Sequence, residues 1–147
     1  MTEGELVLAQ ARDWIGTPYL HQASVRGSGA DCLGLLRGIW REVYGAEPEE
    51  VPPYTPDWAE PARREVLLAA ARRWLAEKPL NDAALGDVLL FRMREGGIAK
   101  HLGIQSRLGP HPQFIHSYTN YGVIESSFSI PWQRRVVARF AFPEGTK

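Results

Sequence analysis

The sequence changes from helical to strand-like patterning at Gly86, and this change limits the folds open to the chain. Beyond Gly86, short apolar segments alternate with turn residues, as expected for consecutive antiparallel strands. Five strands are predicted: Val88–Met93, Lys100–Ser106, Gln113–Tyr118, Val123–Ser127 and Arg134–Phe142. Helical patterns before Gly86 and strands after it indicate an α+β domain in which the helices pack on an antiparallel sheet of about five strands.

Three helices are predicted ahead of these strands. Thr2 and Glu5 have the spacing of a capping box, which opens a helix that ends near Ile15. A second helix runs from about Cys32 to Tyr44, with apolar residues at every third or fourth position and Gly45 as its stop. A third opens at Asp57 or Glu60 and ends near Glu77, before Pro79.

Two connections between these helices have no regular pattern. Tyr19–Ala30 is polar and rich in glycine, which predicts an irregular loop beside a site. Glu47–Pro56 contains four prolines, which remove backbone donors and fix the backbone. We expect it to be a surface connection, and it is a candidate docking segment for a partner.

Composition limits the class of function. A length of 147 residues suits one domain spanning 1–147. Basic and acidic residues each number 17, so a broad basic surface for nucleic acid or an anionic membrane is not expected. The sequence contains neither a secretory signal nor a transmembrane run, so we expect a chain made in the cytoplasm without membrane insertion.

Cys32 is the single cysteine, so no internal disulfide can form. It opens the second predicted helix, behind the glycine-rich stretch Arg26–Ala30, and Asp31 before it is a favourable N-cap. The unpaired amides and dipole of the first helical turn favour a thiolate, whereas the Asp31 charge opposes it. We interpret Cys32 as a nucleophile that needs a histidine base. The alternative is a small buried apolar residue.

His101 and His116 are two of the four histidines and lie in adjacent predicted strands. If the hairpin is centred between Leu108 and Gly109, the numbers of facing residues sum to 217, which makes the two histidines direct neighbours. Their Cβ atoms would be about 4.5–5.5 Å apart, so one imidazole could orient the other. A bulge would change this register. The alternatives are two ordinary strand residues, or a zinc site that includes Cys32.

The order of five motifs resembles that of NlpC/P60 cysteine peptidases. The motifs are Gly16-Thr17-Pro18-Tyr19, Asp31-Cys32-Leu33-Gly34, Gly86-Asp87-Val88-Leu89-Leu90-Phe91, His101-Leu102-Gly103-Ile104 and Phe114-Ile115-His116. The likeness covers nearly the whole chain. It implies a small papain-like fold and hydrolysis of amide bonds in peptidoglycan stem peptides, commonly between D-γ-glutamate and a diamino acid.

The resemblance also implies a role for each matched residue. Cys32 falls on the family's nucleophile, His101 on its base and His116 on its polar third member. Tyr19 matches an aromatic hydroxyl beside the nucleophile, and Asp31 matches a position that receives a free substrate amine in some relatives. No metal or other cofactor is implied.

Leu33 departs from the family pattern, because many members carry serine there, close to the substrate. The stretch Tyr19–Gly27 is most similar to a short branch associated with the tails of phages and gene transfer agents. This similarity implies tail proteins as partners and action in the periplasm or cell wall.

Two further functions stay open. The chain could be a non-catalytic tail-assembly or wall-binding component, or it could use the same three residues as an acyltransferase or amidase.

Overall fold

The structure, a computed structural model, describes residues 2–48 and 65–144. Helix α1 spans Glu3–Asp13. The predicted capping box is present: the Thr2 hydroxyl accepts from the Glu5 amide at 3.0 Å, and the Glu5 carboxylate accepts from the Thr2 amide at 2.9 Å. These two bonds satisfy amides that have no partner within the helix.

Helix α2 spans Cys32–Tyr44, as predicted. Asp31 caps it by accepting a hydrogen bond from the Gly34 amide at 2.7 Å, and the chain leaves the helix at Gly45 with a φ of 95°. Glycine adopts this left-handed conformation without the steric cost that a Cβ would bring.

Helix α3 spans Val66–Trp74. The predicted start of this helix at Asp57 or Glu60, and the connection from residue 49 onward, lie outside the described residues. The prediction that it ends near Glu77 is wrong. Leu75 has an extended backbone, and the next residues form strand β3, Ala76–Lys78, which pairs with the last strand of the sheet.

The principal sheet has six strands in the order β3-β8-β4-β5-β6-β7. Its remaining strands are β4 Val88–Arg92, β5 Ala99–Arg107, β6 Gln113–Tyr118, β7 Gly122–Ser127 and β8 Val136–Ala141. Strands β4 to β7 form the predicted antiparallel meander. Strand β8 does not continue it, because it returns to pair with β4 and then receives β3 at its free edge.

Besides β3, a short hairpin and a short helix were not predicted. Within the segment expected to be irregular, β1 (Ser24–Val25) and β2 (Gly29–Ala30) form an antiparallel hairpin. Helix α4, Ile130–Gln133, takes residues that precede the predicted last strand. The sequence carries a signal for α4, since Ser129 occupies its N-cap position and Pro131 lies in its first turn.

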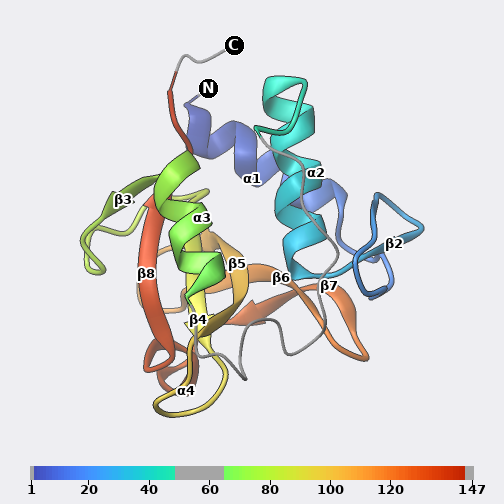
Figure 1. Cartoon of the computed structure of the whole chain (residues 1–147). Coiled ribbons are helices and arrows are strands. Elements are labelled where there is room, and N and C mark those ends of the chain that lie inside the picture. Colours follow the sequence, from blue (N-terminus) through green and yellow to red (C-terminus); the bar gives the residue numbers. More distant parts are fainter. Residues whose placement is uncertain (1, 49–64, 145–147) are drawn as a thin grey trace.

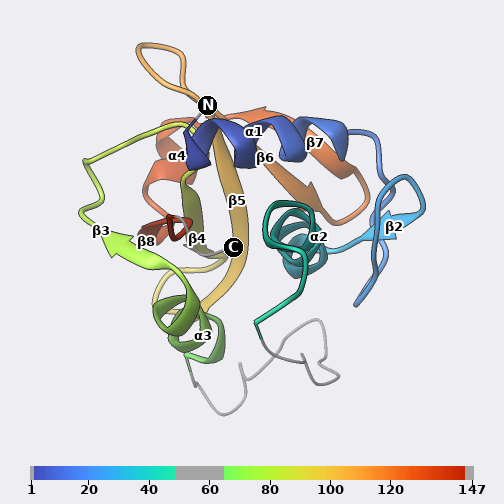
Figure 2. The same ribbon diagram turned by 90° about the horizontal axis from the view of Figure 1, so that it is seen from above.

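Helices α1, α2 and α3 lie over one face of the principal sheet (Figure 1). Figure 2 shows α2 nearly end-on, with α1 running across the view next to it. On the same face of the sheet, α3 lies toward β3. The apolar stripe of α2 packs into the core through Leu35, Ile39 and Val43, against sheet residues such as Leu102 and Ile115. This packing holds the N-terminus of α2, and therefore Cys32, against the sheet.

Alternate residues of the strands form a smaller core on the other face. Leu89, Phe91, Phe114 and Phe128 are buried there, and Trp132 of α4 packs against them. The period of two along each strand assigns neighbours to opposite faces, as Ile115 and Phe114 show. The second core matters for the site because both histidines contact it.

Candidate active site

Cys32 is the first residue of α2 and lines a pocket of about 120 Å³. Three other residues singled out from the sequence line the same pocket, namely Tyr19, Asp31 and His101. The remaining lining residues are His21, Met93, Lys100, Ser117, Tyr118 and Thr119. The Cys32 Sγ lies 4.0 Å from the carbonyl oxygen of Lys100, the residue directly before His101 in β5. The structure therefore brings the predicted nucleophile and the predicted base to one pocket.

Burial raises the pKa of the Cys32 thiol to about 12, and the negative charge of Asp31 adds to this effect. Backbone amides of Leu102, Leu33 and Cys32 itself act in the opposite direction, since they stabilise negative charge on sulfur. The expected thiolate-favouring influence of the helix N-terminus is present but is outweighed. Cys32 is a neutral thiol at physiological pH, so it needs a base during attack.

Asp31 is buried and its carboxylate has structural partners. One oxygen accepts from the Gly34 amide at 2.7 Å and the other from the Gln22 amide at 2.7 Å. The N-cap interpretation of Asp31 is confirmed, and the carboxylate also holds the loop before β1 against α2. A substrate role for Asp31 stays a prediction, supported by its place in the pocket lining.

His101 and His116 are hydrogen-bonded through His101 Nε2 and His116 Nδ1, which lie 2.8 Å apart. The predicted register is nevertheless wrong. Ile104 faces Ile115, so the numbers of paired residues sum to 219 and not 217, and a bulge lies between Gln105 and Arg107. Because the error is two residues, the histidines keep a common face of the sheet and meet diagonally.

Gly103 explains how the two rings come so close. A Cβ built at Gly103 would lie 2.7 Å from the Phe114 ring, 3.0 Å from the carbonyl oxygen of Ile115 and 3.2 Å from the Cβ of His116. A side chain at Gly103 would therefore displace the Phe114 ring and press on the backbone of β6 at Ile115 and His116. The glycine after Leu102 in the motif thus allows His116 to reach His101.

An aromatic enclosure surrounds the two imidazoles. The Trp132 ring centroid lies 5.8 Å from that of His101 and 5.3 Å from that of His116, and Phe91 and Phe114 also contact the pair. Burial lowers the pKa of His101 to about 3, with a further contribution from His116, and lowers the pKa of His116 to about 4. Both rings are neutral at pH 7, and neutral His101 can accept a proton.

Tyr19 reaches the pocket from the segment before the β1–β2 hairpin, where it forms an isolated bridge with Ala30. Burial raises the pKa of its hydroxyl, and a hydrogen bond with Thr119 opposes that change. The hydroxyl is therefore protonated and can donate a hydrogen bond to a substrate oxygen.

Three residues at the site were not identified from the sequence. His21 Nδ1 lies 3.8 Å from an Asp31 carboxylate oxygen, in the loop that was expected to be irregular. Trp132 covers the histidines from α4. Ser126 Oγ lies 2.9 Å from His116 Nε2. Ser126 reaches His116 through the register of β6 and β7, which the sequence does not reveal. Trp132 could have been placed on a short helix from the capping signals of α4, Ser129 and Pro131.

The described residues contain no group of three His, Cys, Asp or Glu side chains that could hold a metal ion. The geometry therefore does not support the zinc interpretation of Cys32, His101 and His116. Among the described helices, none combines the length and apolar character that crossing a bilayer requires.

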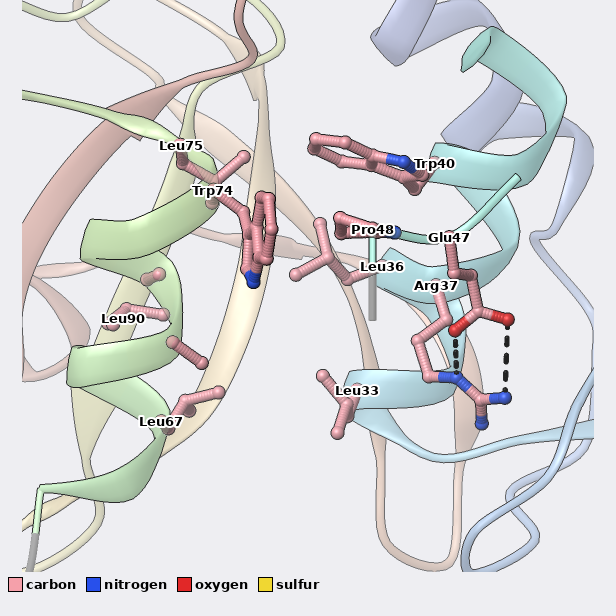
Figure 3. Close-up of a pocket in the computed structure, with 12 residues that line it drawn as sticks. Leu33, Leu36, Arg37, Trp40, Glu47, Pro48, Leu67, Trp74, Leu75 and Leu90 are labelled. Atoms are coloured by element: carbon pink, nitrogen blue, oxygen red, sulfur yellow. Dashed lines mark hydrogen bonds and ion pairs between the residues drawn. The ribbon is translucent and has the colours of Figure 1, made fainter. Parts of the chain in front are cut away.

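A second pocket, of about 100 Å³, lies between α2 and α3 (Figure 3). Leu36 and Trp40 point into it from α2, and Leu67 and Trp74 from α3. Its charged lining residues, Arg37 and Glu47, are hydrogen-bonded to each other at 2.7 Å. This apolar pocket provides neither a nucleophile nor a base, so the pocket of Cys32 is the candidate active site.

Comparisons with known proteins point to one fold. Over 130 residues the chain is 31% identical to the Murein DD-endopeptidase MepS/Murein LD-carboxypeptidase of Escherichia coli, a match that covers 88% of this chain and 57% of the relative. The chain thus spans little more than half the length of that curated relative. No protein-family model matches the chain.

Solved structures extend this result. An NlpC/P60 family protein from Bacillus cereus superposes with a TM-score of 0.64 at 17% identity, over 95% of this chain and 40% of that chain. An N-acetylmuramoyl-L-alanine amidase from Bacteroides uniformis gives a TM-score of 0.53 at 11% identity, over 94% of this chain and 97% of that chain. The helices, the mainly antiparallel sheet and these neighbours establish that the chain has the α+β fold of NlpC/P60 proteins.

Proposed function

We propose that the protein is a peptidoglycan hydrolase of the NlpC/P60 cysteine peptidase type, with Cys32 as nucleophile, His101 as base and His116 as the residue that orients His101. One observation carries this proposal: Cys32 and His101 line the same pocket while Nε2 of His101 is hydrogen-bonded to His116. That bond leaves Nδ1 of His101 to receive the thiol proton.

The proposed reaction follows from these protonation states. As Sγ attacks the scissile carbonyl carbon, the thiol proton passes to Nδ1 of His101, and the carbonyl oxygen becomes an oxyanion. The C–N bond then breaks, and His101 gives its proton to the leaving amine. Water attacks the resulting thioester and transfers a proton to His101. The acyl group leaves as an acid, and the proton returns to Sγ.

Backbone amides are the candidate stabilisers of the oxyanion. The amide of Cys32 lies in the first turn of α2, where amides have no partner within the helix. The protonated hydroxyl of Tyr19 is a second donor at the same pocket. A single such donor is worth about 2.7–4 kcal/mol of transition-state stabilisation.

The proposed substrate is a peptidoglycan stem peptide, and the bond is the amide between D-γ-glutamate and a diamino acid. The name of the Escherichia coli relative supports a murein substrate. Asp31 is the candidate acceptor for a substrate amine. Leu33, where many family members carry serine, lines the apolar pocket beside α2 and is not among the residues that line the pocket of Cys32.

We further propose that the protein acts at the cell wall together with a phage-like tail. The similarity of Tyr19–Gly27 to tail-associated sequences supports this proposal. Co-purification of the protein with tail particles tests it, and particles that lack the protein would contradict it.

Digestion of purified muropeptides tests the proposed activity. Mass spectrometry should find a new amine and a new carboxylate at one stem-peptide bond, and the position of that bond separates an endopeptidase from an amidase. Alkylation of Cys32 should abolish cleavage, whereas a chelator should leave it unchanged. Intact muropeptides after prolonged incubation would favour a non-catalytic wall-binding role, and turnover of thioesters alone would favour an acyltransferase.

A further inference from the structure

Ser126 continues the hydrogen-bonded pair of histidines across a third strand. His101 lies in β5, His116 in β6 and Ser126 in β7, and the two contacts are 2.8 Å and 2.9 Å long. In the β6–β7 register His116 faces Ile124, and Ser126 faces Phe114. Ser126 is therefore two residues from the position opposite His116, on the same face of the sheet. The His101–His116 and His116–Ser126 contacts therefore have the same geometry: each joins residues on adjacent strands that are offset by two positions from direct pairing.

His101, His116 and Ser126 form a hydrogen-bonded row, and this row links the tautomers of the two imidazoles. A neutral imidazole has one N–H donor and one acceptor nitrogen. His101 can accept the Cys32 proton at Nδ1 only if its proton is on Nε2, and this N–H then donates to Nδ1 of His116. His116 must in turn carry its proton on Nε2, where the nearest acceptor is the Ser126 oxygen.

The opposite arrangement would disable the base. If the Ser126 hydroxyl donated to Nε2 of His116, the Nδ1–H of His116 would donate to Nε2 of His101. The proton of His101 would then lie on Nδ1, where it prevents uptake of the thiol proton. Both arrangements satisfy the hydrogen bonds of the row, so the group at position 126 influences which one is populated.

We propose that Ser126 is a positioning residue that acts through His116: its oxygen accepts the Nε2–H of His116 in the tautomer that keeps Nδ1 of His101 available to Cys32. The effect of Ser126 on catalysis rests on the proposed function. Its effect on the tautomers of His116 and His101 does not, because the tautomers can be observed without a substrate.

Burial makes this contact consequential. His116 is 1% exposed and His101 6% exposed, so water has little access to replace a lost partner. Ser126 itself is only partly buried, which leaves room to exchange its side chain. Ser127, the next residue of β7, faces Gln113, is exposed and lies on the other face of the strand. It provides a matched control.

Three substitutions test the proposal in the 147-residue chain. Ser126→Ala removes the acceptor and should lower kcat roughly three- to tenfold with KM unchanged, the range expected for one hydrogen bond. Ser126→Thr restores a hydroxyl and should recover most of the activity. Ser126→Asp provides an acceptor without a donor and should move the acid limb of the kcat/KM profile to higher pH by about one unit, because a carboxylate stabilises a protonated imidazole. Ser127→Ala should match the wild type.

Imidazole ¹⁵N NMR spectra of the same proteins supply the readout that is independent of activity. In the wild type at pH 7, both histidines should carry their proton on Nε2, and Ser126→Ala should shift His116 toward a mixture of tautomers. A wild-type protein with protons on Nδ1, or identical His116 spectra in wild type and Ser126→Ala, would overturn the proposal. A wild type that shows the Nε2–H tautomers but cleaves no muropeptide would contradict the proposed function and leave the role of Ser126 intact.

Discussion

His101 Nε2 lies 2.8 Å from His116 Nδ1, and this bond leaves Nδ1 of His101 without a hydrogen bond to any residue that the structure describes. Graded effects of substitution follow. His101→Ala should lower kcat by about 10²–10⁴-fold, the usual contribution of a general base. His116→Ala and His116→Asn should leave more activity, because the base is still present and only its orientation and tautomer are lost.

Steady-state kinetics on muropeptides provide the measurement for these variants. His111→Ala is the control, since His111 is exposed in the β5–β6 loop. Equal losses in the His101 and His116 variants would show that the two residues do not have the different roles assigned to them.

Alkylation of Cys32 should depend steeply on pH. Burial and the Asp31 charge raise the pKa of the thiol to about 12. Below that pKa the thiolate fraction rises about tenfold per pH unit, and the thiolate is the reactive form. The rate with iodoacetamide should therefore increase continuously from pH 6 to pH 9.

Asp31→Asn keeps a capping side chain but removes the charge beside sulfur. The variant should be alkylated faster than the wild type at each pH, because the pKa of Cys32 falls. A wild-type rate that is constant over this pH range would instead indicate a preformed thiolate–imidazolium pair.

The buried histidines should make the fold sensitive to acid. Burial lowers the pKa of His101 to about 3 and that of His116 to about 4, below the ordinary value of 6.5 that applies in the unfolded chain. The unfolded state therefore binds more protons as pH falls below 6.5, and the free energy of unfolding falls with it until the folded-state pKa values are reached. The slope approaches about 1.4 kcal/mol per pH unit for each histidine.

Urea denaturation at pH 7 and pH 5 measures this dependence. His116→Gln should reduce the difference between the two free energies of unfolding, whereas His111→Gln should leave it unchanged. An equal pH dependence in wild type and His116→Gln would contradict the account.

Gly38 is predicted to be essential to the contact between α1 and α2. A Cβ at this position would lie 2.0 Å from Cζ2 of Trp14, whose side chain is 1% exposed. Gly38→Ala should therefore destabilise the fold by about 1–3 kcal/mol through overpacking, although alanine is the better helix former. Trp14→Phe removes the clashing atoms, so the same substitution should cost less in that background. Thermal unfolding of the four proteins in this cycle tests the prediction, and additive effects would count against a direct contact.

Local signals predicted the elements that position the nucleophile. The apolar period of α2, its cap at Asp31 and its stop at Gly45 all lie within one continuous segment, residues 31–45, so the bounds of α2 were predicted correctly. Strand β3 was assigned to a helix because its place depends on pairing with β8, which is distant in the sequence. The β5–β6 register was wrong because a bulge after Gln105 and a longer loop change the count, and neither is encoded by apolar alternation.

The candidate site was also predicted only in part, because some of its properties depend on contacts between residues that are distant in the sequence. Motif resemblance made Cys32, His101 and His116 candidates. The structure places Cys32 and His101 in one pocket and joins His101 to His116 by a hydrogen bond, while their catalytic roles stay predictions. The pKa of Cys32 depends on how deeply the thiol is buried, and the role of Ser126 depends on the register of β6 and β7. Both are properties of the packed fold.

The acyl-enzyme provides the most direct test of the central claim that Cys32 attacks the substrate with His101 as its base. Muropeptides are mixed with the protein, the reaction is quenched in acid within its first turnover, and the protein is digested for mass spectrometry. The account predicts the mass of the acyl half of the substrate on the peptide that contains Cys32, and no such adduct in Cys32→Ala or His101→Ala. Undiminished cleavage by Cys32→Ala, with no adduct at Cys32 in the wild type, would contradict it.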